Sequence, residues 1–191
     1  GLFDWSTFAN IYDTYKKGDP KKWGITQIKK KGLRDFGASL GPEAAHHIAI
    51  GAETLALRQT QQCANASLMT AFLEKHELVK AVYYPGLESH AQHQRAADLF
   101  RHPGGLFSFE LAEGVDLWDF MNRFQVIVKS SNLGDNRTLA IPVAHTIYFE
   151  MGPERRASMG IDESLIRVSV GIEDGEDLIT DLQQAFAGVD G

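Results

Sequence analysis

The residue with the strongest chemical signal in this 191-residue sequence is Arg167, which interrupts an apolar run from 165 to 170. The run is rich in strand-forming residues, and strand alternation places Leu165, Arg167 and Ser169 on one face and three aliphatic side chains on the other. Because a guanidinium is always charged and is rarely buried without an anion, the Arg167 face should border a cleft or solvent. Pattern alone leaves two partners open, a ligand anion or a neighbouring carboxylate. The candidate carboxylates are Glu163, Glu173 and Asp174.

A polar turn at 129–139 is the second candidate for a binding role. It follows a strand that should end at Val128, and it contains Asn132, Leu133 and Gly134. Glycine-containing turns can present backbone N–H groups to an anion. From the pattern alone, an ordinary connecting turn is the favoured interpretation.

The histidines and the cysteine give weaker signals. His90 and His93 are three residues apart on one face of an expected helix, but no cluster of further metal ligands accompanies them. Cys63 lies in a helical run and is interpreted as a packing residue. The sequence contains no phosphate-binding glycine loop, zinc pattern or activated-serine motif. We therefore assign no metal site and no catalytic residue to this chain.

Lysines are concentrated between residues 6 and 31, with aromatic residues among them. Such a stretch could contact nucleic acid or an acidic partner. The formal net charge of −6 argues against a nucleic-acid partner, so a solvated surface is favoured. The lysines are Lys16, Lys17, Lys21, Lys22, Lys29, Lys30 and Lys31, and the aromatic residues are Tyr12, Tyr15 and Trp23.

Composition places the chain among globular proteins. Its 43% hydrophobic and 23% charged residues are ordinary values, and they allow the chain to bury a core. A single cysteine cannot form an internal disulfide and indicates a reducing, cytoplasmic environment. No apolar run is long enough to span a membrane, so no membrane partner is expected.

Hydrophobic periodicity predicts an α/β sandwich, in which helices cover a small sheet. Gly41 and Pro42 should open a helix, and Asp174 should cap the last one. Further helices are expected at 60–76, 89–100 and 115–124, and the first of these could join the Pro42 helix into one long, bent helix. Strands are expected at 79–83, 106–111, 126–128 and 165–170.

Five stretches together resemble the C-terminal part of the Cys/Met-metabolism enzymes that use pyridoxal phosphate (PLP), the cystathionine γ-synthase-like family. They occur in the family's order and spacing and extend over nearly the whole chain. Each stretch is a weak signal, but their combination is specific. The stretches are 32–38, 53–58, 82–90, 132–135 and 166–174.

The resemblance implies a fold type I PLP enzyme. Residues 1–57 would be the end of the large PLP-binding domain, which is incomplete here, and residues 58–191 the C-terminal domain, with a long connecting helix. Arg167 matches the family's arginine for the substrate carboxylate. Asn132 and Leu133 match a turn beside the substrate, where many members have serine in place of Asn132. The Asn-Leu-Gly-Asp form is closer to the O-acetylhomoserine sulfhydrylase-like branch.

The implied activity is β- or γ-elimination, or γ-replacement, on sulfur-containing or O-acylated amino acids, by a homotetrameric lyase or transferase. The Schiff-base lysine and most PLP contacts of the family would precede Gly1, so the chain alone should be inactive and should need the missing N-terminal half. The alternative is a non-catalytic assembly or binding module that retains the fold. Residues 141–148 depart from the family's His-Pro-Ala segment, which leaves the substrate open.

Overall fold

The computed structural model describes residues 18–34, 37 and 39–189, and its contacts divide the chain into two units between Ala52 and Glu53. The first unit contains short helical turns and α4 (Pro42–Glu53). Proline in the first turn of α4 matches the predicted helix start. The predicted domain limits of 1–57 and 58–191 refer to a larger enzyme and stay a prediction. The short turns are η2 (Pro20–Lys22), α2 (Trp23–Gln27) and the π-helix η3 (Ile28–Leu33).

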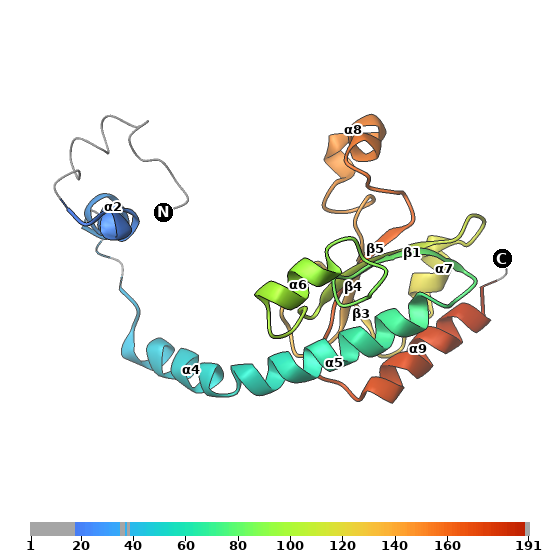
Figure 1. The fold of residues 1–191 in the computed structure, drawn as a ribbon, viewed down its shortest axis with the longest axis horizontal. Coiled ribbons are helices and arrows are strands. Elements are labelled where there is room, and N and C mark those ends of the chain that lie inside the picture. The colour runs from blue at the N-terminus through green and yellow to red at the C-terminus, as the bar shows by residue number, and fades with distance from the viewer. Residues whose placement is uncertain (1–17, 35–36, 38, 190–191) are drawn as a thin grey trace. The chain divides into compact units, whose positions relative to one another are not determined.

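The second unit is built on a five-stranded sheet with the order β1-β2-β5-β4-β3 (Figure 1). Neighbouring strands are antiparallel except β3 and β4, which are parallel. The strands are β1 (Val79–Tyr83), β2 (Leu106–Leu111), β3 (Val128–Lys129), β4 (Leu139–Pro142) and β5 (Leu165–Ser169). The helices are α5 (Leu55–Leu73), α6 (His93–Leu99), α7 (Leu117–Asn122), the 3-10 turn η4 (Phe149–Met151), α8 (Pro153–Ser158) and α9 (Gly175–Ala187).

Helices α5 and α9 pack side by side over one face of this sheet (Figure 1). Phe109 from β2 and Ile166 and Val168 from β5 are buried in that core, together with Met69 from α5 and Leu182 from α9. Burial of these side chains supplies the main stabilisation of the layer. The aliphatic face predicted for the 165–170 strand is therefore the core face, as expected.

The alternation that buries Ile166 and Val168 directs Arg167 to the opposite face of the sheet, here called the open face. The last helix begins as predicted, because the Asp174 carboxylate accepts a hydrogen bond from the Glu176 N–H at 2.8 Å. The α/β prediction is thus correct in its layers and in the position of β5.

Several predicted element bounds were wrong. The long, bent helix is two helices, α4 and α5, separated at Thr54. The strand predicted at 126–128 begins only at Val128, because Asp181 accepts the N–H groups of Gln125, Val126 and Ile127. Those donors are then unavailable for a strand ladder. The helices predicted at 89–100 and 115–124 are shorter, and β4 and α8 were not predicted.

Candidate substrate-carboxylate site

Arg167 lies in the middle of the sheet. Its strand, β5, is the third of five, and the register places Arg167 between Ser108 of β2 and Ile141 of β4. A residue in this position is surrounded by other strands, so its backbone is fixed by ladders on both sides. The guanidinium is therefore carried by one of the most constrained positions of the second unit.

The guanidinium of Arg167 is only partly supplied with acceptors. Its Nη2 donates a hydrogen bond to the backbone oxygen of Ser131 at 2.8 Å. Its Nε is buried and has no hydrogen-bond partner among the described residues. A buried donor without an acceptor costs about 1–3 kcal/mol, and such groups are rare unless a ligand completes them. The arrangement therefore leaves donor capacity for an anion.

The carboxylates considered as alternative partners of Arg167 have other roles. Glu163 pairs with Arg156 at 2.6 Å. Glu173 accepts hydrogen bonds from the backbone N–H and the hydroxyl of Thr138 at 2.5 and 2.9 Å. Asp174 caps α9. Within the described part of the chain, the structure thus gives no support to the salt-bridge interpretation of Arg167.

The turn at 129–139 brings Asn132 and Leu133 next to Ser131, the residue that Arg167 contacts, and both side chains are exposed. Two backbone donors of this turn are already used. The Asn132 N–H donates to the Ser130 hydroxyl at 3.4 Å, and the Gly134 N–H donates to the Ser169 hydroxyl at 3.0 Å. These two N–H groups are thus not open to an anion, which agrees with the connecting turn that the pattern favoured, and the guanidinium is the better anion donor.

Gln62 of α5 holds the far side of this turn, Asn65 of α5 holds the segment that follows β5, and sequence reasoning missed both. Gln62 donates to the backbone oxygen of Asp135 at 3.0 Å. Asn65 donates to the backbone oxygens of Gly171 and Glu173 at 3.2 and 2.8 Å. Gln62 and Asn65 are buried and three residues apart, so they share a helix face. Two amide side chains among the apolar residues on one face of the helix were the sequence feature that could have predicted these contacts.

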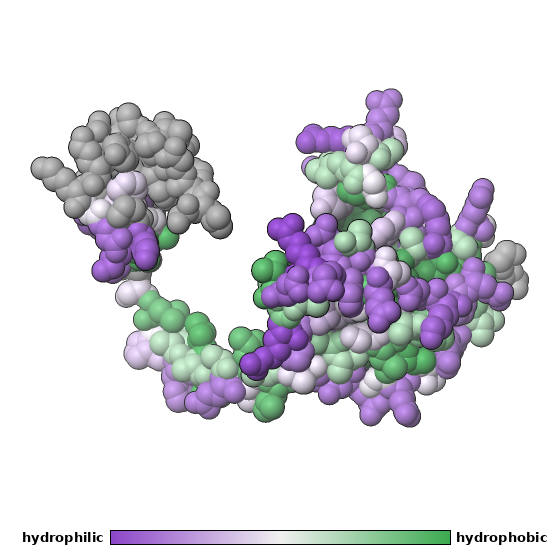
Figure 2. Space-filling model, viewed as in Figure 1, coloured by the Kyte–Doolittle hydropathy of each residue, from purple (hydrophilic) through white to green (hydrophobic). Residues whose placement is uncertain are grey.

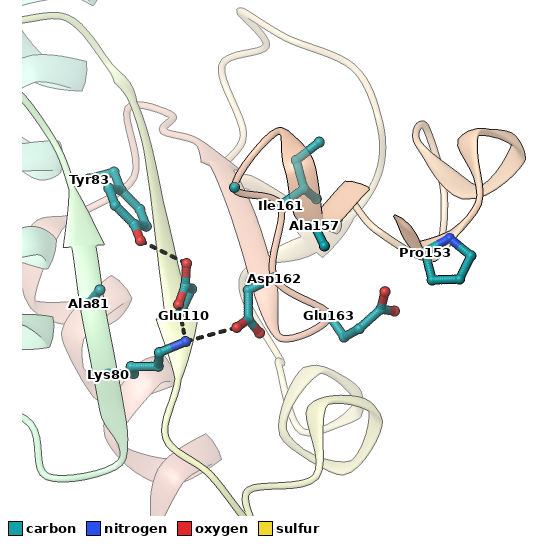
Figure 3. Close-up of a pocket in the computed structure, with 10 residues that line it drawn as sticks. Lys80, Ala81, Tyr83, Glu110, Pro153, Ala157, Ile161, Asp162 and Glu163 are labelled. Carbon is teal, nitrogen blue, oxygen red and sulfur yellow. Dashed lines mark hydrogen bonds and ion pairs between the residues drawn. The ribbon is translucent and has the colours of Figure 1, made fainter. Parts of the chain in front are cut away.

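A second polar cluster lines a cavity of about 720 Å³ beside β1 and β2 (Figure 3). The Tyr83 hydroxyl donates to Glu110 at 2.7 Å, and the Lys80 ammonium lies 2.7 Å from Glu110 and 2.8 Å from Asp162. The hydrogen bond from Lys80 lowers the pKa of Asp162 to about 2. Hydrogen bonds to the same two carboxylates raise the pKa of Lys80, which opposes the neutral amine that Schiff-base formation requires.

The remaining sequence candidates do not form a site. His90 and His93 are engaged in local contacts, with the backbone of Gln92 and of Pro85 respectively. No group of three His, Cys, Asp or Glu residues suited to a metal occurs in the described ranges. Cys63 is a free thiol buried in α5, which agrees with a packing role.

The lysine-rich stretch lies only partly within the described residues. The side chains of Lys21, Lys22, Lys29 and Lys30 are exposed. Lys16 and Lys17 fall outside the described ranges. Exposure fits the predicted solvated surface, but it does not test a partner. Of the helices whose structure is described, none is both long and apolar enough to cross a bilayer.

Comparison with known proteins identifies the class. A family model described as Cys/Met metabolism PLP-dependent enzyme matches residues 15–187. The fold is shared with fold type I PLP enzymes. A cystathionine gamma-lyase from Lactobacillus plantarum, solved in complex with L-serine, matches with a TM-score of 0.77 and 31% identity over 89% of this chain and 44% of that chain. The chain belongs to the Cys/Met-metabolism family of PLP-dependent enzymes.

Sequence relatives point to several activities within that family. An L-methionine gamma-lyase of Pseudomonas putida is 40% identical over 164 residues, which is 85% of this chain and 41% of the relative. An O-acetyl-L-homoserine sulfhydrylase of Thermus thermophilus is 38% identical over 85% of this chain and 39% of the relative. The chain thus spans less than half the length of these relatives.

The family depends on PLP, but the described residues do not form a recognisable cradle for it. Lys80 is held by two carboxylates, and the Lys129 ammonium donates to the Asn122 side chain at 3.0 Å. Among the described residues, the buried donor without a partner belongs to an arginine, which suits a carboxylate rather than the cofactor aldehyde. We therefore assign no cofactor contact to the described residues.

Proposed function

We propose that this chain is the C-terminal part of a PLP-dependent trans-sulfuration enzyme that catalyses β- or γ-elimination, or γ-replacement, on sulfur-containing or O-acylated amino acids. Within it, Arg167, Asn132 and Leu133 form the substrate-binding part of the site. The observation that carries this proposal is the guanidinium of Arg167 on the open face of the sheet, which makes one hydrogen bond, to a backbone oxygen, and has no carboxylate partner among the described residues. Family membership and the matching relatives support the reaction class.

The role of Arg167 follows from the geometry of its side chain. A planar guanidinium binds a carboxylate through two parallel hydrogen bonds, which fix the orientation of the amino acid as well as its position. The bond from Nη2 to Ser131 restrains the guanidinium before substrate arrives. Orientation in advance reduces the entropy lost on binding.

Asn132 and Leu133 supply the adjacent wall of the site. Asn132 presents an exposed amide, and Leu133 presents exposed apolar surface, on a turn that contacts Arg167. An amide can donate to a carboxylate oxygen, as the serine of other family members would. When bound, PLP acts as the electron sink for the reaction, while these residues bind and orient the substrate.

In such an enzyme, residues 1–57 would be the end of the PLP-binding domain, and residues 58–191 would be the C-terminal domain. The Schiff-base lysine would lie in the N-terminal half that the matched relatives possess beyond this chain, and the whole enzyme would be a homotetramer in the cytoplasm. The reading frame before Gly1 tests this directly. A frame without a lysine-bearing large domain would contradict the proposal.

Borohydride trapping provides the biochemical test. The chain is incubated with PLP, reduced, digested and mapped by mass spectrometry. We expect substoichiometric adducts distributed over exposed lysines and no turnover of cysteine or an O-acylhomoserine, because Lys80 is held as an ammonium. A single stoichiometric lysine adduct with turnover would contradict the assignment of the catalytic lysine to the missing half.

A non-catalytic assembly module is the second candidate function, and the exposed apolar side chains of α4 are compatible with it. Apolar side chains are exposed on this helix, among them Ile48 and Ile50. Figure 2 shows hydrophobic surface over this part of the chain. Contiguous exposed apolar surface promotes association. Light scattering after size-exclusion chromatography should show oligomers under either function. Oligomers together with no turnover by the longer, PLP-loaded protein would favour the module.

A further inference from the structure

Ser169 is a second polar residue on the open face of β5, two positions after Arg167. Although it lies on the face opposite α5 and α9, its side chain is only 5% exposed. The hydroxyl accepts a hydrogen bond from the backbone N–H of Gly134 at 3.0 Å. The turn that carries Asn132 and Leu133 is therefore attached directly to Ser169.

Two hydrogen bonds of opposite direction join β5 to this turn. Arg167 donates to the backbone oxygen of Ser131, and Ser169 accepts from the N–H of Gly134. The residues between these two points of attachment are Asn132 and Leu133, the proposed neighbours of the substrate. A segment held at both ends keeps a defined distance and orientation relative to the strand, which a single attachment cannot ensure.

The backbone at Gly134 explains why a second attachment matters. Gly134 has φ +75°, a conformation open to glycine at little cost, and a Cβ placed there would meet nothing within 4 Å. No other side chain of the described residues therefore packs against the Cβ side of Gly134. Gln62 and Glu173 hold the chain further on, at Asp135 and Thr138. The hydroxyl of Ser169 is the contact that fixes Gly134 itself.

We propose that Ser169 is a positioning residue for the substrate-carboxylate site, acting through Gly134 to hold Asn132 and Leu133 at a fixed distance from Arg167. This inference rests on the proposed function of Arg167. Without the hydroxyl, Arg167 would supply the remaining side-chain bond from β5 to residues 131–134, and Arg167 is the group that must also bind the substrate. Binding would then have to order the turn as well as hold the carboxylate.

The test uses the longer, PLP-loaded enzyme that contains this chain. Ser169→Ala should raise KM for the amino-acid substrate about 3- to 10-fold, the range of one ordinary hydrogen bond, with kcat and cofactor absorbance nearly unchanged. Hydrogen–deuterium exchange of the peptide spanning 130–138 should become faster. Ser169→Thr, which keeps the hydroxyl, should restore most of both properties. The matched control is Ser158→Ala, at an exposed serine whose hydroxyl bonds locally to Arg155.

Three outcomes separate this inference from the proposed function. Unchanged KM and unchanged exchange in Ser169→Ala, with a large loss in Arg167→Ala, would overturn the positioning role alone. Faster exchange with unchanged KM would also overturn it, because the turn would then be held without consequence for substrate. Normal activity in Arg167→Ala would instead overturn the proposed function. Should Ser169→Ala fail to fold, Ser169→Cys preserves the volume with a poor acceptor and should show the same rise in KM.

Discussion

Arg156 and Arg167 are both arginines of the second unit, yet the structure treats them differently. Arg156 is 7% exposed, and each of its three side-chain nitrogens has an acceptor. Its Nε and Nη2 donate to Glu163 at 3.1 and 2.6 Å, and its Nη1 donates to the backbone oxygen of Phe149 at 3.2 Å. Arg167 has one such bond, to Ser131, and a buried Nε without a partner in the described ranges.

The two arginines carry the same charge, and they differ in how many of their side-chain nitrogens have a hydrogen-bond acceptor. A guanidinium whose nitrogens all have acceptors within the protein stabilises the fold, so its removal should lower the free energy of unfolding. An unsaturated guanidinium held in the centre of a sheet retains donors for a ligand, and its removal should be felt as lost binding. The contacts of Arg156 therefore indicate a structural role, and those of Arg167 are compatible with the proposed substrate role.

The most severe test of this comparison is Arg167→Ala in the PLP-loaded longer enzyme. Loss of one partner of a buried charge pair typically costs about 2–5 kcal/mol, so kcat/KM should fall on the order of 30- to several-thousand-fold. Arg167→Lys should recover only part of the loss, because an ammonium cannot form the planar fork. Steady-state kinetics with amino-acid substrates and the cofactor absorbance measure both.

Cofactor occupancy is the control for that variant, because Arg167 is not assigned to the phosphate or the ring. Absorbance close to that of the unmodified enzyme is expected. Near-normal kcat/KM in Arg167→Ala would end the carboxylate assignment. Unfolding or loss of PLP would show that Arg167, like Arg156, serves the structure.

Arg156→Ala tests the other side of the comparison and should mainly lower stability. Arg156 is buried, but the Glu163 side chain is 55% exposed, so solvent screens the pair and the loss should be about 1–3 kcal/mol. Denaturant unfolding, followed by circular dichroism, measures it. Glu163→Gln should cost less, because an amide oxygen still accepts from Arg156. Equal stability of Arg156→Ala and the unmodified protein would remove the structural assignment.

Acid titration extends the comparison to Asp162, another saturated group. Lys80 and Ser164 hold the pKa of Asp162 at about 2, below its unfolded value near 4. Its contribution to stability is therefore present above pH 4 and is lost as the pH falls towards 2. After allowance for its partial exposure the effect should be about 0.5 kcal/mol. In Asp162→Asn, the free energy of unfolding should depend less steeply on pH between pH 5 and 2.5 than in the unmodified protein.

Asp135 provides the matched control for the titration. Its pKa is also lowered to about 2, through hydrogen bonds from Arg137, but the Arg137 side chain is 66% exposed, whereas Lys80 also pairs with the buried Glu110. We expect Asp135→Asn to change the slope less, and that small change to vanish in high salt. An equal or larger effect at Asp135 would indicate that the Lys80 pairs contribute nothing beyond surface electrostatics.

Asn132→Ser should have the smallest effect of these variants, and it tests whether the Asn132 side chain contacts the substrate. It installs the serine that many family members have at this position, and it leaves the hydrogen bonds of Arg167 and Ser169 in place. KM should change by less than about threefold, because one neutral donor replaces another. Asn132→Leu, which has no donor, should raise KM more. Equal kinetics of the two variants would show that the Asn132 side chain does not reach the substrate.

Local patterns in the sequence were sufficient for several parts of this protein. A run of strand-forming residues predicted β1, period-two alternation predicted β2 and the two faces of β5, and Asp174 marked the start of α9. These features depend on residues a few positions apart, which is the range over which backbone geometry and capping act. The same alternation directed attention to Arg167 as the charged residue in an apolar strand.

The tertiary structure alone decided which arginine is saturated and what holds the binding turn. Ser131 and Arg167 are 36 residues apart, and Gln62 reaches Asp135 across 73. Such contacts have no periodic signature, because a polar side chain can find its acceptor anywhere that the chain returns. The sequence by itself determined that the Arg167 guanidinium would lie on the open face of its strand. Folding determined that its Nη2 would be satisfied and its Nε would not, since that depends on where the distant backbone oxygens come to lie.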